Sequence, residues 1–445
     1  MRVKLIQPKM IKRPMDTELK LRMSPHLGLL TIANIIRDKC EVSIENENIN
    51  DLDFTDVADI VGITITVDVL PRAIEIAKKF KEKGSIIVAG GIHVTTAPSS
   101  IPKEIFDVIC IGHGETTWPK IINDYNNNTL KSSYTSTPIK GSDIVSPAYD
   151  MINMDDYLYC NIVYTSRSCP FRCDFCYNSS GNHQFLNREI DDVIQDIKYL
   201  NTKHIMFIDD NFIGNPNWTK SFLEKIMPLG LKWNAAVSSN ILNYPDLLDL
   251  MKESGCKSLF IGFESINENS ISSVNKIQNN IREYEHLIEE LHNRDIMING
   301  SFVFGLDGDS LSTFKNTVDW IVKQKIETIT SHILTPYPGT KFYDRMLSSN
   351  RITDFNLSKY NTASVVFEPL GMTKDELYNG YIGVYKELYS FKNIIKRMPK
   401  RGFQVFPYLT FNFLYRKYGK FTEFFCNIIS YRNVGKIAQL LSRYV

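Results

Sequence analysis

The sequence predicts an α/β protein with three parts: a doubly wound parallel sheet, a second parallel sheet of barrel type and a mostly helical C-terminal region. Short apolar runs alternate with amphipathic segments up to about residue 350. These runs are nearly continuous, as is typical of parallel strands that are buried on both faces. A polar stretch without periodicity, residues 126–155, separates the alternation into two halves and is predicted to be a linker.

Residues 1–125 are expected to form a flavodoxin- or Rossmann-like domain. Apolar runs such as "VKLIQP", "IVGITITV" and "SIIVAGG" predict its strands, and "PRAIEIAKKFKEKG" predicts a helix between two of them. Ligands of such sheets bind at the carboxyl ends of the strands, where glycine allows close approach of the backbone. Tight turns also need glycine for purely structural reasons, so both interpretations stay open. The candidate ligand-binding residues at these turns are Gly90, Gly91, His93, Gly112, Gly114 and Glu115.

Residues 156–350 repeat the alternation six times, which predicts a partial (βα)6 barrel of the TIM type. Its strands are expected at "NIVYTS", "HIMFIDD", "KWNAAVSS", "SLFIGFES", "MINGSFVFGLD" and "TITSHILTPYPG". The active site of such a barrel lies at the carboxyl ends of its strands. Polar residues follow the apolar runs there: Asp209, Asp210, Ser238 and Glu264. The alternative for each is a structural role, as a strand-end residue that caps the next helix.

The stretch "RSCPFRCDFCYN", residues 167–178, places Cys169, Cys173 and Cys176 within eight positions. The whole chain has eight cysteines, too few for a disulfide scaffold, so a tight group indicates metal binding or catalysis. Four thiolates would close the coordination of a structural zinc or an ordinary cluster, whereas three leave one position open. Zinc would need a fourth ligand such as His183, whose loop lacks the usual spacing. A [4Fe-4S] cluster with one open iron fits better.

The spacing Cys169-x-x-x-Cys173-x-Phe175-Cys176, after the first strand of a parallel barrel, resembles the signature of the radical S-adenosylmethionine (SAM) superfamily. The resemblance implies that the three cysteines hold a [4Fe-4S] cluster and that SAM binds its fourth iron. Reductive cleavage of SAM then yields a 5′-deoxyadenosyl radical, which removes a hydrogen atom from the substrate. Phe175 would contact the adenine. The polar strand-end residues would surround the rest of SAM: Asp209, Asp210, Ser238 and Glu264.

Nearly the entire chain resembles those radical SAM proteins that carry an N-terminal cobalamin-binding-type domain, through "GGIHVT", "GHGE", "GSFVFGLDGD" and "TPYPGT". The resemblance implies cobalamin as a further cofactor, bound at the glycine-rich strand ends of the first domain. The lower-ligand motif Asp-x-His-x-x-Gly is absent, because His26 and His93 stand outside its spacing. Ser168 replaces the glycine that usually precedes the first cysteine, a change expected to be tolerated.

The leading functional interpretation is a radical SAM methyltransferase that uses cobalamin to methylate an unactivated carbon of a small molecule or lipid. The alternative is a cobalamin-independent radical enzyme that forms C–C bonds, rearranges or cyclises its substrate in natural-product or lipid biosynthesis. A metal-dependent ligand-sensing protein is the third interpretation, and the polar strand ends argue against it. Either enzyme would need an electron donor such as flavodoxin or ferredoxin.

Composition and charge exclude other classes. The chain is 43% hydrophobic with a formal net charge of +1, which is ordinary for a globular protein and gives no field that would attract nucleic acid. The N-terminal residues become polar too soon for a signal peptide, and no apolar stretch is long enough to span a membrane. Both observations predict a cytoplasmic protein.

Residues 351–445 differ from the rest of the chain. Thr373 and Glu376 have the spacing of a capping box, which predicts a helix that begins near Thr373. After residue 390 the sequence is basic and aromatic, as in "FQVFPYLTFNFLYRKYGKFTEFF". Helices that pack on the barrel and helices that contact a membrane surface both match this pattern.

Overall fold

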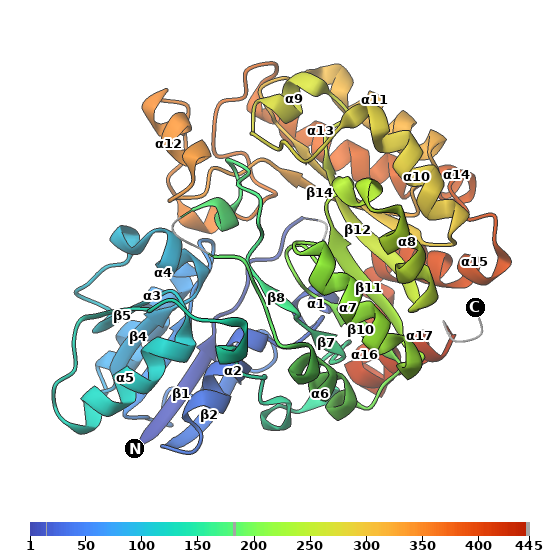
Figure 1. The fold of residues 1–445 in the computed structure, drawn as a ribbon. Helices are drawn as coiled ribbons and strands as arrows, with labels where there is room; N and C mark the ends of the chain where they lie inside the picture. The colour runs from blue at the N-terminus through green and yellow to red at the C-terminus, as the bar shows by residue number, and fades with distance from the viewer. Residues whose placement is uncertain (15, 181–183, 442–445) are drawn as a thin grey trace.

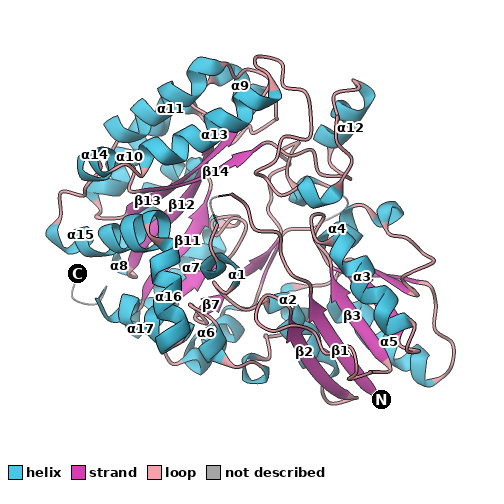
Figure 2. Ribbon diagram, turned by 180° about the vertical axis from the view of Figure 1, so that it is seen from behind, coloured by secondary structure: helices cyan, strands magenta, loops and turns pink. Residues whose placement is uncertain are grey.

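A computed structural model describes residues 1–14, 16–180 and 184–441, and it confirms the predicted α/β fold class. Two parallel sheets stand side by side, and the helices of the C-terminal region lie against the second one (Figures 1 and 2). His183, which we considered as a zinc ligand, lies outside the described residues.

The first sheet has six parallel strands in the order β2-β1-β3-β4-β5-β6. Helix α3 packs on one face through Ala73 and Phe80, while α2 and α5 pack on the other through Ala33 and Ile121. Apolar strands covered on both faces are what the continuous runs predict. The elements are β1 (Arg2–Gln7), α1 (Glu18–Leu21), α2 (Leu27–Ile36), β2 (Glu41–Asn46), β3 (Ile60–Thr64), α3 (Leu70–Lys81), β4 (Ile86–Gly90), α4 (Ile92–Thr96), β5 (Val108–Ile111), α5 (Gly114–Asn126) and β6 (Ser133–Thr135).

The segment 126–155, predicted as a linker, is partly built into this sheet. Strand β6 pairs in parallel with β5, from Ile109 opposite Ser133 to Ile111 opposite Thr135. Only Tyr134 of its three residues is buried. An edge strand this short and polar has no apolar run, which is why the sequence pattern missed it.

The second sheet has six parallel strands in the order β14-β13-β12-β11-β10-β7, so consecutive strands are neighbours and β7 and β14 are its two edges. This is the predicted partial barrel, and its helices pack outside the strands (Figure 1). The elements are β7 (Ile162–Val163), α6 (Ile190–Leu200), β10 (His204–Phe207), α7 (Pro216–Ile226), β11 (Lys232–Val237), α8 (Pro245–Glu253), β12 (Cys256–Glu264), α9 (Glu268–Ser272), α10 (Tyr284–Asn293), β13 (Met297–Phe304), α11 (Leu311–Lys323), β14 (Thr328–Ile333) and α12 (Lys341–Ser348).

A short antiparallel hairpin, which the sequence pattern did not predict, follows β7. Strand β8 (Ser166–Arg167) pairs with β9 (Leu186–Asn187). The cysteine stretch lies between these two strands, so the hairpin joins the two ends of the loop that carries the thiols.

The C-terminal helices cover the open edge of β14. Helix α13 begins after Thr373 with the predicted capping box to Glu376. The hydroxyl of Tyr389 accepts from the N–H of Ile329 (3.3 Å) and donates to the C=O of Ile329 (3.1 Å), and Tyr385 does the same at Ser331. These hydroxyls satisfy backbone groups that an edge strand leaves unpaired. The elements are α13 (Lys374–Leu388), α14 (Phe391–Lys396), α15 (Gly402–Leu409), a π-helix (Thr410–Lys417), α16 (Gly419–Ile429) and α17 (Tyr431–Leu441).

The gap between β7 and β14 is filled by the segment that follows β1. The N–H groups of Leu158 and Tyr159, just before β7, donate to the carbonyls of Arg22 (2.9 Å) and Met23 (2.8 Å). A small apolar cluster joins this segment to the C-terminal helices: Leu19, Leu158, Cys426 and Tyr431. Residues near the N-terminus therefore help to line the side of the barrel.

Candidate active site

Cys169, Cys173 and Cys176 lie on the loop after β8, and all three are free thiols. Burial, with smaller contributions from Cys173, Asp210 and Cys169, raises the pKa of the Cys176 thiol to about 12. Burial also raises the pKa of Cys169, where Asp210 and Cys173 add to it. The three sulfurs are thus within electrostatic reach of one another, and they would ionise when a metal binds them.

Lys276 and Gln278 approach the same thiols from the segment between α9 and α10. The side-chain amide of Gln278 donates to Cys173 Sγ at 3.4 Å. Lys276 is buried, which lowers its pKa, but Glu264, together with Cys173 and Cys176 when these are ionised, more than offsets burial, so that its pKa is raised. An N–H donor and a positive charge both stabilise thiolates. The donor set therefore fits an anionic iron–sulfur cluster. No three His, Cys, Asp or Glu side chains in the described part of the chain form a ready-made site for a single metal ion.

Glu264 is held in an unusual backbone conformation at the end of β12. The pairing of β12 with β13 shifts register between Gly262 and Glu264, and Glu264 has φ +63°, a left-handed conformation that costs roughly 1–3 kcal/mol for a non-glycine residue. Its carboxylate accepts from Lys276 Nζ at 2.5 Å and from Ser301 Oγ at 3.4 Å. Local irregularity of this kind re-aims a side chain and concentrates at functional sites.

Asp209 holds together the strand ends beside the cysteine loop. Its Oδ1 accepts from the backbone N–H of Thr165 (2.9 Å) and of Ser166 (2.5 Å), and from both hydroxyls. Burial raises its pKa to about 6, although these hydrogen bonds oppose the shift. Asp209 thus links β10 to the start of the loop. Asp210 is exposed and close to the sulfurs of Cys169 and Cys176.

Ser238 also links two strand ends. Its N–H donates to Asn211 Oδ1 at 3.3 Å, its hydroxyl accepts from Asn211 Nδ2 at 3.2 Å, and the same hydroxyl donates to Asn240 at 2.5 Å. Among the predicted strand-end residues, Asp210 and Glu264 are therefore the ones placed near the thiols, while Asp209 and Ser238 hold neighbouring strands together.

The different roles of the two adjacent aspartates predict different mutant phenotypes. Asp209→Ala is expected to lower the free energy of unfolding by about 2–4 kcal/mol, because buried donors of Thr165 and Ser166 lose their acceptor. Asp210→Ala, the matched control, is expected to change it by no more than about 0.5 kcal/mol because the residue is exposed. Denaturant unfolding of both variants measures the difference. Equal losses would contradict the structural role of Asp209.

Ser168, which stands where a glycine usually precedes the first cysteine, has φ +67°. This left-handed conformation explains why glycine suits the position before the first cysteine. Serine is accommodated there at a cost of roughly 1–2 kcal/mol.

Aromatic side chains connect the cysteine loop to the first sheet. Phe175 is partly buried and packs against the core of the second sheet. Tyr177, next to Cys176, stacks on Tyr337 with 4.2 Å between ring centroids, and both join a cluster with Val67, which follows β3. A second connection is the ion pair between Arg167 Nη2 and Glu115 Oε1, 2.8 Å apart. The carboxyl ends of the first sheet therefore face the cysteine loop.

Two of the predicted glycines, Gly91 and Gly112, are required by their local structure. A Cβ on Gly91 would lie 2.7 Å from the backbone nitrogen of Ile65, and one on Gly112 would lie 2.1 Å from Ser136 Oγ. A Cβ on Gly114 would clash only with the end of the Ile32 side chain, which can move. Gly91 and Gly112 also have φ of +106° and +86°. Gly90 has more room, since its Cβ would come no closer than 3.9 Å to the Cβ of Cys110.

The other two candidates of the first domain have partners within the protein. His93 is fully buried and its Nε2 lies 2.9 Å from Ser100 Oγ. Burial lowers its pKa to about 4, so the imidazole is neutral at pH 7. Glu115 pairs with Arg167. A cobalamin at this sheet edge fits the fold and the facing arrangement, without a histidine ligand from His93.

A group of cations lines the inner side of β14. Thr330 and His332 alternate with core residues of that strand and so face the barrel interior. Arg13 donates to Thr362 Oγ1 (2.7 Å) and lies 3.4 Å from His332 Nδ1, while Arg416 Nη2 is 3.5 Å from Thr330 Oγ1.

Lys20 is close to these cations. Burial, then the charges of Arg13 and Arg416, lower its pKa to about 8 although Asp16 opposes the shift. Asp16 forms an ion pair with Arg13, 3.0 Å between the charged atoms. The sequence pattern missed Arg13, Lys20 and Arg416 because they come from opposite ends of the chain.

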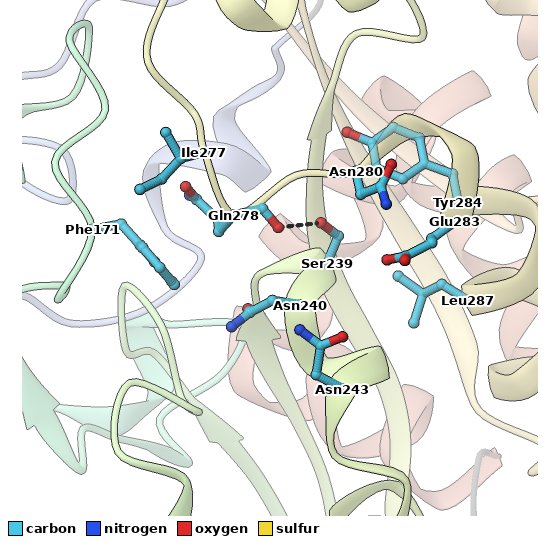
Figure 3. Close-up of a pocket in the computed structure, with 10 residues that line it drawn as sticks. All are labelled: Phe171, Ser239, Asn240, Asn243, Ile277, Gln278, Asn280, Glu283, Tyr284 and Leu287. Carbon is cyan, nitrogen blue, oxygen red and sulfur yellow. Dashed lines mark hydrogen bonds between the residues drawn. The ribbon is translucent and has the colours of Figure 1, made fainter.

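A cavity of about 400 Å³ lies beside the cysteine loop, and Figure 3 shows residues that line it. The hydroxyl of Ser239 donates to the backbone carbonyl of Gln278 across it (3.3 Å). Because Gln278 also contacts Cys173, the cavity adjoins the thiols. It is lined by Phe171 of the loop, by Ser239, Asn240 and Asn243 after β11, and by Gln278 and Asn280 after β12.

The chain is similar in sequence to one family model and to several enzymes. Residues 163–321 match the model of the radical SAM superfamily. The bacteriochlorophyllide d C-12(1)-methyltransferase of Chlorobaculum tepidum is 31% identical over 391 residues, which cover 84% of this chain and 85% of that protein. The anaerobic magnesium-protoporphyrin IX monomethyl ester cyclase of Cereibacter sphaeroides is 23% identical, and the match covers 78% of this chain and 62% of that protein.

Among solved structures, the chain has the fold of TsrM from Kitasatospora setae, a radical SAM methyltransferase determined with cobalamin and a [4Fe-4S] cluster bound. The TM-score is 0.65 at 14% sequence identity, over 87% of this chain and 88% of that one. Both sheets are included in a match of this extent.

Proposed function

The chain belongs to the radical SAM superfamily, in the group with an N-terminal cobalamin-binding-type domain, and we propose that it methylates an unactivated carbon of a small molecule. The observation that carries this proposal is that the carboxyl ends of both sheets face each other across the cysteine loop. The Arg167–Glu115 ion pair and the stacking of Tyr177 hold this arrangement. A methyl carrier on the first sheet would thereby adjoin the site where a radical is formed.

Cys169, Cys173 and Cys176 would ligate three irons of a [4Fe-4S] cluster, and SAM would bind the fourth. The cluster and SAM together would supply a carbon radical that is reactive enough to remove a hydrogen atom from an unactivated C–H bond. No side-chain base can do this. Gln278 donates to one of the thiolates, and Lys276 balances their charge. We place Phe175 at the adenine, and Asp210 and Glu264 beside the polar end of SAM.

Cobalamin would bind at the carboxyl edge of the first sheet, where the turn at Gly90 has room, and would carry the methyl group. His93 is fully buried within the protein and its Nε2 lies 2.9 Å from Ser100 Oγ, so this proposal assigns it no role as a ligand. Electrons would come from a small donor of the flavodoxin or ferredoxin type.

We further propose that the substrate is a tetrapyrrole that carries a carboxylate. The 31% identical relative is named for its action on bacteriochlorophyllide d. The group formed by Arg13, Lys20 and Arg416 on the inner side of the barrel supports an anionic substrate, since burial and the charges of Arg13 and Arg416 lower the pKa of Lys20, and a bound anion would oppose that shift.

Lys20→Gln is expected to raise KM for such a substrate about tenfold, because an ion pair inside a barrel contributes about 1.5–3 kcal/mol. The formation of 5′-deoxyadenosine in the absence of substrate should not change, since the groups that affect the pKa of Lys20 are Arg13, Asp16 and Arg416 and not the thiols. Lys12→Gln, on the same segment but at the surface, is the control. An unchanged KM in Lys20→Gln would remove this group from the substrate site.

The reaction itself is tested with SAM that carries a trideuterated methyl group. Anaerobic incubation of reconstituted enzyme with bacteriochlorophyllide d and a reductant is expected to give a product heavier by one deuterated methyl group. A rearranged or ring-closed product without deuterium would contradict methyl transfer and favour the cobalamin-independent alternative.

A further inference from the structure

Helix α16 presents its apolar side to the outside of the protein. Residues 421, 424, 425 and 428 have the i, i+3, i+4, i+7 spacing of one helical face, and they are Phe421, Phe424, Phe425 and Ile428. Their exposed fractions are 58%, 59%, 40% and 65%. The amphipathic helices of a globular protein normally turn such a face toward the core. The face of α16 that packs inward carries Gly419 and Cys426 instead.

The neighbouring helices extend this surface. Helices α14, α15 and α16 lie on the same side of the molecule in both views (Figures 1 and 2). Phe391 of α14 contacts Phe413, with 5.5 Å between ring centroids, and Phe413 is 6.4 Å from Tyr418. We call the exposed set the aromatic surface: Phe391, Ile395, Phe403, Phe406, Leu414, Tyr418, Phe421, Phe424, Phe425, Ile428 and Ile429.

Cations outnumber acids in the segment that carries the aromatic surface, although Arg397 is buried and Arg401 and Arg432 form ion pairs with Asp295 and Asp155. Residues 391–441 contain ten lysines and arginines and one acid, Glu423, in a chain whose formal net charge is +1. Four lysines of this segment are exposed: Lys392, Lys396, Lys400 and Lys420. Aromatic and aliphatic side chains flanked by lysine are typical of helices that lie in the interface of an anionic membrane.

We propose that the aromatic surface docks the protein on the surface of a lipid bilayer that contains anionic lipids, with α16 lying in the plane of the interface. Charge selects this occupant. A second copy of the chain would bring the two sets of cations together, whereas anionic headgroups complement them. The part of the chain that the structure describes has no helix long and apolar enough to cross a bilayer.

Docking on this side would also place a second cavity of the protein next to the membrane. A cavity of about 240 Å³ lined by Tyr385, Lys386, Tyr389, Arg416 and Lys417 lies beside the aromatic surface. Lys417 Nζ lies 4.3 Å from the ring centroid of Phe391, and Arg416 reaches Thr330 of β14. An apolar molecule that partitions into the bilayer would meet the protein at this face.

Co-sedimentation with vesicles tests the proposal. The full-length protein is expected to bind vesicles of phosphatidylcholine and phosphatidylglycerol in equal parts, and to bind pure phosphatidylcholine at least about tenfold more weakly. The variant F421S/F424S/F425S is expected to lose at least about tenfold in binding to the anionic vesicles. Phe355→Ser, which changes a phenylalanine that is 61% exposed outside this region, is the matched control and should bind like the wild type.

A second variant, K392E/K396E/K420E, keeps the aromatic side chains and reverses exposed charges. It is expected to lose binding to the anionic vesicles, and its thermal unfolding and iron content should match the wild type. Wild-type binding by either variant would overturn the proposal. A self-associating protein that ignores vesicles and becomes monomeric in F421S/F424S/F425S would overturn it in favour of a dimer interface.

Discussion

Cys173→Ala is expected to abolish both cluster assembly and SAM cleavage. Cys173 is one of three thiols that would hold the irons, and the side-chain amide of Gln278 donates a hydrogen bond to its sulfur. The two cysteines that remain cannot hold a cluster that needs three thiolate ligands and leaves its fourth iron open. Iron and sulfide analysis after anaerobic reconstitution, together with 5′-deoxyadenosine detected by chromatography, measures the effect, and both should fall to background.

The matched control is Cys40→Ala, which removes a thiol of the first domain whose Sγ donates to the backbone carbonyl of Ile36. It should assemble the cluster and cleave SAM like the wild type. A Cys173→Ala variant that still produced 5′-deoxyadenosine would refute the assignment of the three thiols.

Breaking the buried ion pair between Glu264 and Lys276 is expected to lower both the stability of the protein and its affinity for SAM. The two losses have different causes. Both side chains are buried and their charged atoms lie 2.5 Å apart. Glu264→Ala leaves the ammonium without its partner, so the free energy of unfolding should fall by about 3–5 kcal/mol. The affinity for SAM should fall as well, while the iron content should be kept because the three thiols remain.

The double variant E264L/K276M distinguishes the two effects. Replacing both charges by apolar side chains of similar size removes the unpaired charge, so most of the lost stability should return. SAM binding, measured by equilibrium dialysis, should stay weak because the carboxylate is gone. Recovery of SAM affinity along with stability would show that Glu264 acts only as a structural partner of Lys276.

The parts of the fold that could be predicted are those with local patterns. The apolar runs gave the strands of both sheets, except for the polar edge strand β6, and the capping box gave the start of α13. The hairpin of β8 and β9 was missed because two residues on each side are too few to form a pattern. The glycine-rich turns match both a ligand site and a structural need, and close contacts with positive φ account for Gly91 and Gly112.

Contacts between distant residues limited the prediction of the site. The thiols could be found from their spacing, but Lys276 and Gln278 approach them from about a hundred positions further along the chain, and neither residue type is distinctive by itself. Arg13 and Arg416 are brought together only because the segment after β1 and the C-terminal helices close the same gap in the barrel. Such groupings depend on tertiary packing and leave no local pattern.

The central claim is that one chain holds a three-thiolate [4Fe-4S] cluster on its second sheet and cobalamin on its first. Its most direct test is anaerobic reconstitution with iron, sulfide and hydroxocobalamin, followed by desalting and absorption spectroscopy. We expect the bands of the cluster and of cobalamin to remain together in stoichiometric amounts. A cluster that remains without cobalamin would contradict the claim and point to the cobalamin-independent radical reaction.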